Sequence, residues 1–133
     1  MELVATKMCM TKDIGVHGNM FGGLMLALLD EAGAILSSQI AGSESMVTVK
    51  MEEVVFKKPV KVGQIIRIYG AIAEIGKSSI TLQLEAKSYN VKSEIEKPIC
   101  STKITFVRID KDGESMPIAP SVREKYKEYS KYK

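Results

Sequence analysis

The chain has 133 residues, of which 45% are hydrophobic and 26% are charged, and its net charge is +3. This length and apolar content predict one domain with a real core, which a partner chain would enlarge. The charge is mild and mostly scattered and tryptophan is absent, so we expect no nucleic-acid interface.

The first half of the chain predicts a strand, a loop and a long helix. Residues 2–10 are rich in β-forming types, and residues 11–20 carry the glycine, aspartate and asparagine of a loop. Residues 21–41 form the helix candidate, with Asn19 as its N-cap and Gly42 as its terminator. Because this helix is apolar nearly all round, we expect other structure to wrap it.

Four further strands are predicted, at 46–56, 64–75, 79–90 and 98–109. The alternation slips phase near Glu52 and Glu53, which predicts a β-bulge. The short connections favour antiparallel neighbours, and residues 121–133 look like a terminal helix. The fold class is therefore α+β, with one curled antiparallel sheet of about five strands around one long helix, plus a C-terminal helix.

The N-terminus has neither the basic flank nor the apolar run of a secretory signal. The apolar run from Met20 to Leu36 contains two carboxylates, so it reads as a buried helix and we expect no membrane span. Cys9 and Cys100 form neither a disulfide framework nor a metal site. These features favour the cytoplasm.

Gly22 and Gly23 stand in the opening turn of the predicted helix, where each glycine costs about 1 kcal/mol relative to alanine. The first amide groups of a helix are unpaired and lie at its positive end, so they can bind a developing oxyanion. The plainer interpretation is that glycine permits close packing of helix on sheet. The pair alone favours packing.

Asp30 and Glu31 interrupt the apolar helix at its middle. Carboxylates are seldom buried without a partner or a purpose, and one held here could act as a general base. The alternative is a solvent-facing stripe, since Ser37 and Ser38 follow about two turns later. His17, the only histidine, lies in the loop before the helix.

The sequence resembles the YciA-type and related cytosolic acyl-CoA thioesterases over residues 2–118. The resemblance begins with the run from Asp13 to Gly23 (DIGVHGNMFGG) and continues with the run from Leu29 to Ala34 (LDEAGA). Four later blocks follow in the family's order: Val47–Glu52, Val55–Val60, Val62–Gln64 and Gly76–Ser79. Each block is weak alone, but the ordered set is specific.

The resemblance implies a hotdog fold over residues 1–118, followed by a charged helical tail at 119–133. It implies hydrolysis of acyl-CoA to a free acid and CoA, with Asp30 as the catalytic carboxylate and the Gly23 N–H as the oxyanion donor. It also implies a homodimer formed through the sheet edge, commonly assembled as a hexamer, with no cofactor beyond the CoA of the substrate. The substrate-binding positions expected from it are Asn19, Phe21, Gly22, Thr48, Lys50, Lys77, Ser78 and Ser79.

The chain departs from this family at Gly15, where many relatives carry an active-site asparagine. Either His17, which some relatives also carry at this position, takes over that role, or the enzyme is weak. Two alternatives remain open: a hotdog hydro-lyase that uses His17 and Glu31, and a non-catalytic acyl-CoA-binding protein.

Overall fold

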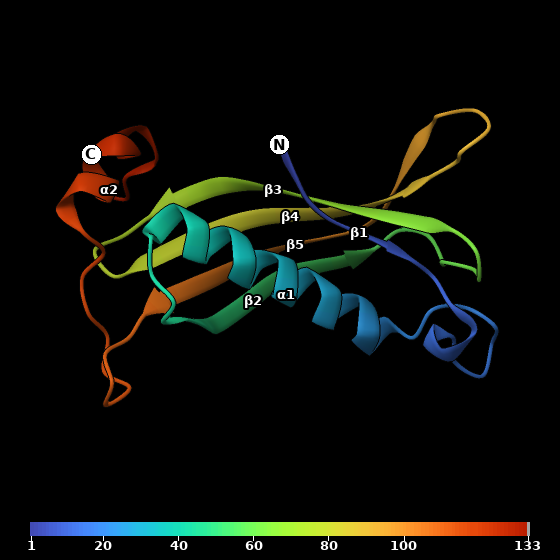
Figure 1. Ribbon diagram of the computed structural model, residues 1–133, viewed down its shortest axis with the longest axis horizontal. Helices are drawn as coiled ribbons and strands as arrows, with labels where there is room; N and C mark the ends of the chain where they lie inside the picture. Colours follow the sequence, from blue (N-terminus) through green and yellow to red (C-terminus); the bar gives the residue numbers. More distant parts are fainter. Residues whose placement is uncertain (133) are drawn as a thin grey trace.

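In the computed structural model, which describes residues 1–132, a five-stranded antiparallel sheet curls along one long helix, α1 (Gly22–Ala41) (Figure 1). The strand order across the sheet is β1-β3-β4-β5-β2. The predicted combination of one sheet and one long helix is confirmed. The strands are β1 (Glu2–Met8), β2 (Met46–Phe56), β3 (Ile65–Ile75), β4 (Ser79–Tyr89) and β5 (Glu96–Arg108).

The core lies between α1 and the concave face of the sheet. Alternate residues of β3, β4 and β5 are fully buried, as their period of two predicted. Gly33 on α1 and Gly70 on β3 let the helix and the sheet pack closely against each other. A Cβ at Gly33 would lie 2.7 Å from the Phe106 ring, and one at Gly70 would lie 2.6 Å from Leu36. Close helix packing therefore explains Gly33, in the middle of α1.

The expectation that consecutive strands are neighbours is wrong for β2 and β3. After Phe56 the chain passes to the opposite end of the strand order, where β3 lies between β1 and β4. Within the described residues β2 pairs only with β5, so it lies at an edge of the sheet. The predicted bulge is confirmed, because the β2–β5 register shifts between Glu52 and Val55 and Glu53 has a φ of 53°. The buried Thr102 hydroxyl donates to the Glu52 carbonyl at 2.8 Å and stabilises this bulge.

Helix α1 begins later than predicted. Its N-cap residue is Phe21, and the Asn19 side chain instead accepts a hydrogen bond from Lys61 Nζ at 2.8 Å. Gly42 ends the helix with a φ of 62°, as predicted. The length and apolar composition of α1 would suit a membrane span, but they also suit a core helix, and α1 packs along the sheet with seven buried residues.

The C-terminal helix is shorter than predicted. It covers only α2 (Pro120–Lys125), followed by the 3-10 turn η2 (Lys127–Tyr129), and Lys133 lies outside the described residues. The helix stops because the chain returns to the sheet, where the Lys131 N–H donates to the Ile75 carbonyl at 2.9 Å. Val122 and Tyr126 pack against the core, so this segment is attached to the sheet domain.

Asp13, at the end of a 3-10 turn (η1, Thr11–Asp13), fixes the loop that leads into α1. Its Oδ2 accepts hydrogen bonds from Lys7 Nζ at 2.9 Å and from the Met10 N–H at 2.8 Å. Its carbonyl accepts the Phe21 N–H at 3.1 Å. The contacts with Lys7 and Met10 hold the pKa of the Asp13 carboxyl below its ordinary value.

This lowered pKa gives the stability a pH dependence. The ionised carboxylate stabilises the fold above the unfolded-state pKa of about 4, and that contribution is lost as the pH falls further. We expect the Tm of Asp13→Asn to lie below that of the wild type at pH 7 and the two values to converge in acid, as measured by circular dichroism. The exposed Asp112→Asn serves as the control, and parallel curves for Asp13→Asn would contradict the anchoring role.

Candidate active site

Asp30 lies halfway along α1, and its carboxylate faces the beginning of β2. Its Oδ1 accepts a hydrogen bond from Thr48 Oγ1 at 2.6 Å. Asp30 is half-buried, whereas Glu31 is exposed and makes no ion pair or side-chain hydrogen bond within residues 1–132. The two adjacent carboxylates therefore occupy different environments, and only Asp30 is held in place by another side chain.

Within residues 1–132, the first turn of α1 presents free amide groups. The Leu24 and Met25 N–H groups donate to the Phe21 carbonyl at 3.0 and 3.2 Å. The Gly22 and Gly23 N–H groups lie too close to the start of the helix to find an acceptor carbonyl within it. Gly23 is exposed, and a Cβ there would lie only 2.8 Å from the Phe21 ring. Glycine thus leaves room for Phe21 beside an open N–H that an anionic oxygen can reach.

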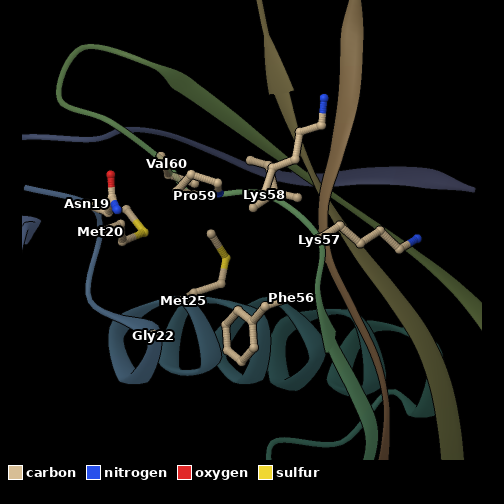
Figure 2. Close-up of a pocket in the computed structure, with 10 residues that line it drawn as sticks. Asn19, Met20, Gly22, Met25, Phe56, Lys57, Lys58, Pro59 and Val60 are labelled. Carbon is tan, nitrogen blue, oxygen red and sulfur yellow. The ribbon is translucent and has the colours of Figure 1, made fainter. Parts of the chain in front are cut away.

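A cavity of about 310 Å³ adjoins this first turn (Figure 2). Its interior is mostly apolar, and Gly22 belongs both to the cavity wall and to the turn with the free amides. Most of this cavity could not be predicted from the sequence, because its methionine, phenylalanine and valine side chains cannot be distinguished there from ordinary core residues. The lining consists of Asn19, Met20, Gly22, Met25, Phe56, Lys57, Lys58, Pro59, Val60 and Ile99.

The edge strand β2 exposes a row of large apolar side chains along its length. Their exposed fractions lie between 36% and 57%, for Val47, Val49, Val54, Val55 and Phe56. On α1, Ile35 is also exposed, so the sheet of one chain leaves part of this helix uncovered. An unpaired strand edge with such a row is typical of a surface that another chain covers.

The two thiols are poor candidates for a nucleophile. Cys9 and Cys100 are buried, and burial raises the pKa of each thiol. Within residues 1–132, no group of three or more histidine, cysteine, aspartate or glutamate side chains could hold a metal ion. Asp30 and the open helix terminus are thus the groups best placed for chemistry.

Residues 17–94 match the family model described as "Thioesterase superfamily". The chain belongs to the thioesterase superfamily.

Relatives within the thioesterase superfamily are similar over nearly the whole chain. An uncharacterized acyl-CoA thioester hydrolase of Haemophilus influenzae is 36% identical over 87% of this chain and 77% of its own length. The acyl-CoA thioester hydrolase YciA of Salmonella typhimurium is 34% identical over 88% of this chain and 90% of its own. The hexameric hotdog fold thioesterase Cj0915 of Campylobacter jejuni superposes with a TM-score of 0.85 at 31% identity, covering 96% of this chain and 97% of that one. The hotdog fold and the YciA-type resemblance are confirmed.

The other predicted substrate-binding positions of this thioesterase-superfamily chain fall on two sides of the sheet. The β2–β5 register shifts between Thr48 and Lys50, so Thr48 faces Asp30 while Lys50 lies in a polar depression on the outer face with Ser79. The same depression holds Lys103 and Thr105. The structure therefore does not bring Lys50 or Ser79 to Asp30 within one chain.

Lys77 and Ser78 form the turn between β3 and β4. Their carbonyls accept the Ile118 and Arg108 N–H groups, both at 2.9 Å, and the Lys77 side chain is exposed. Ser79 pairs with Val107, which in turn pairs with Val47 on β2. This turn therefore lies at the Thr48 end of the sheet, with one strand between them.

His17 lies at the tip of a small hairpin formed by residues 14–20. The Gly15 N–H donates to the Asn19 carbonyl at 2.8 Å, and the Gly18 N–H donates to the Gly15 carbonyl at 3.1 Å. Val16 at the tip is 97% exposed, and His17 is exposed beside it. The hairpin immediately precedes the first turn of α1, so along the chain His17 is nearer to Gly23 than to Asp30.

Proposed function

We propose that this chain hydrolyses acyl-CoA thioesters in a site that two copies share. Its curated relatives named above are acyl-CoA thioester hydrolases, and by homology so is this chain. The observation that carries the mechanism is the Asp30 carboxylate, held at 2.6 Å by Thr48, on the same helix whose opening turn has free N–H groups.

In the proposed reaction, Asp30 takes a proton from a water molecule as the water oxygen attacks the thioester carbonyl carbon. The carbonyl oxygen becomes an oxyanion and accepts a hydrogen bond from the Gly23 N–H. The intermediate then collapses, the carbon–sulfur bond breaks, and the CoA thiolate leaves and takes up the proton. The products are the free acid and CoA.

One helix is poorly suited to bring these two groups to one carbonyl. Gly23 and Asp30 are seven positions apart, which corresponds to about 10 Å along a helix. Antiparallel pairing of the free β2 edge with its copy would place the Thr48 end of one strand beside the Phe56 end of the other. Phe56 lies against the first turn of α1, since a Cβ at Gly22 would be 3.6 Å from its ring. Asp30 of one subunit would then face Gly23 of the other, at two equivalent sites.

The Thr48 hydroxyl positions the Asp30 carboxylate in this scheme. We expect Thr48→Val to lower turnover about tenfold, because the side chain keeps its shape but loses the hydrogen bond that orients the base. Thr48→Ser retains a hydroxyl and serves as the matched control in a steady-state thiol-release assay. Turnover in Thr48→Val equal to that of the wild type would remove Thr48 from the site.

We further propose that CoA runs from Thr48 toward Lys77 and Ser78, where its phosphates meet the lysine. Reversing the charge in Lys77→Glu should raise KM about tenfold at low salt with little change in kcat, and added salt should shrink the difference. Lys92→Glu alters another exposed lysine, in the loop between β4 and β5, and serves as the control. Equal effects of the two variants would direct the search for the phosphate site elsewhere.

We propose that His17 partly replaces the active-site asparagine that many relatives carry at the position of Gly15. Free-thiol release across acyl-CoA substrates of increasing chain length tests the function as a whole. Addition of water to an enoyl-CoA without thiol release would favour the hydro-lyase that uses His17 and Glu31. Tight acyl-CoA binding with neither reaction would favour the non-catalytic binding protein.

A further inference from the structure

The cavity beside the first turn of α1 has fixed walls on three sides. The turn itself supplies Gly22 and Met25, and the preceding loop supplies Asn19 and Met20. The Met20 N–H donates to the Val60 carbonyl at 2.7 Å, which ties this loop to the third wall.

The third wall follows β2 and is tied to β5. It runs through residues 56–60, and the Lys57 N–H donates to the Ile99 carbonyl at 2.7 Å. Val60 and Ile99 are buried, and Met25 is also buried at the opposite side of the cavity. All three walls are therefore held by backbone hydrogen bonds, so the cavity has a defined size.

The chemistry of the interior is apolar and that of its rim is cationic. Figure 2 shows Met25 rising from α1 toward Met20 and Val60, while the amines of Lys57 and Lys58 point away from the cavity. The lysine stems can cover apolar surface while their charges stay in water. An uncharged, flexible chain suits this interior better than a phosphate does.

We infer that this cavity receives the acyl chain of the substrate and that Met20, Met25 and Phe56 limit its length. This inference rests on the proposed thioesterase function, because Gly22 joins the cavity to the amides that would hold the thioester carbonyl. A volume of about 310 Å³ holds roughly ten water-sized groups at about 30 Å³ each. The preferred substrates are therefore acyl-CoAs with unbranched, uncharged chains of up to about ten carbons.

The first test is a chain-length profile of kcat/KM from two to sixteen carbons. In the wild type, kcat/KM should rise up to about fourfold per methylene until about ten carbons and then stop rising. Met25→Ala enlarges the cavity and should move this limit two or three carbons longer, whereas Met20→Phe should shorten it. Leu36→Ala, at a buried position three turns further along α1, is the control and should change all lengths alike.

Calorimetry with straight-chain carboxylates of four to fourteen carbons tests the cavity without relying on turnover. Their affinity for the wild type should rise with each methylene and level off near the same length. Affinity that ignores chain length, or a Met25→Ala profile that merely parallels Leu36→Ala, would overturn the inference. So would a loss of affinity for CoA itself in Met25→Ala, because it would show that the cavity takes the pantetheine arm. Absence of thiol release at every length, with carboxylate binding as expected, would instead reject the proposed reaction and leave the cavity assignment standing.

Discussion

Replacement of Asp30 by asparagine is expected to lower thioester turnover by about 100-fold or more, because the amide cannot accept a proton from the attacking water. The substitution keeps the size of the side chain and a carbonyl oxygen that can still accept the Thr48 hydrogen bond. We therefore expect the variant to fold, with a Tm close to that of the wild type. Steady-state thiol release and thermal unfolding together measure both effects.

The adjacent carboxylate provides the matched control for this experiment. Glu31 is exposed and one residue away, so Glu31→Gln removes the same charge from the same helix without touching the proposed base. Its turnover should stay within a few-fold of the wild type. An Asp30→Asn enzyme that remained as active as Glu31→Gln would remove Asp30 from the mechanism.

Mixing two inactive variants should restore activity if each site takes Asp30 from one subunit and Gly23 from the other. Asp30→Asn lacks the base, and Gly23→Val places a branched side chain against Phe21 and over the oxyanion amide. Phe21 is 65% exposed and its ring can move aside, so the second variant should still fold. After subunit exchange, a mixed dimer holds one site with both defects and one with neither.

The expected size of the recovery follows from random pairing. An equal mixture yields mixed dimers in about half of the population, each with one intact site of two, so activity should reach about a quarter of the wild-type value. Subunit exchange can be verified independently with differently tagged chains. Exchange without recovered activity would mean that each chain contains a complete site.

Periodicity in the sequence was enough to predict the elements and the class of fold. The alternation of apolar residues in β4 and the long apolar run of α1 reflect which of their side chains are buried. The break in alternation at Glu52 and Glu53 coincides with the observed bulge. The position of β2 could not be predicted in this way. The link between Phe56 and Ile65 is short enough for a hairpin, yet β3 is separated from β2 by β4 and β5 in the strand order.

The candidate site was predicted only in part, for a related reason. Asp30 and Gly23 stand out because a carboxylate and a glycine are unusual in an apolar helix. The orientation of Lys50 depends on the register shift after Thr48, which regular alternation hides. The residue type of Asn19 predicts an N-cap, but its side chain accepts a hydrogen bond from Lys61, forty-two positions later. Contacts so distant in sequence leave no local pattern.

In the proposed shared site, the free edge of β2 would make catalysis depend on how many copies of the chain are present. If the base and the oxyanion donor belong to different subunits, a newly made chain has neither a complete site nor cover for its apolar edge strand. Dilution below the dissociation constant of the dimer would then abolish turnover per chain, while higher concentrations would raise it to a plateau. Expression level would thus set not only the amount of this thioesterase but also the fraction of it that works.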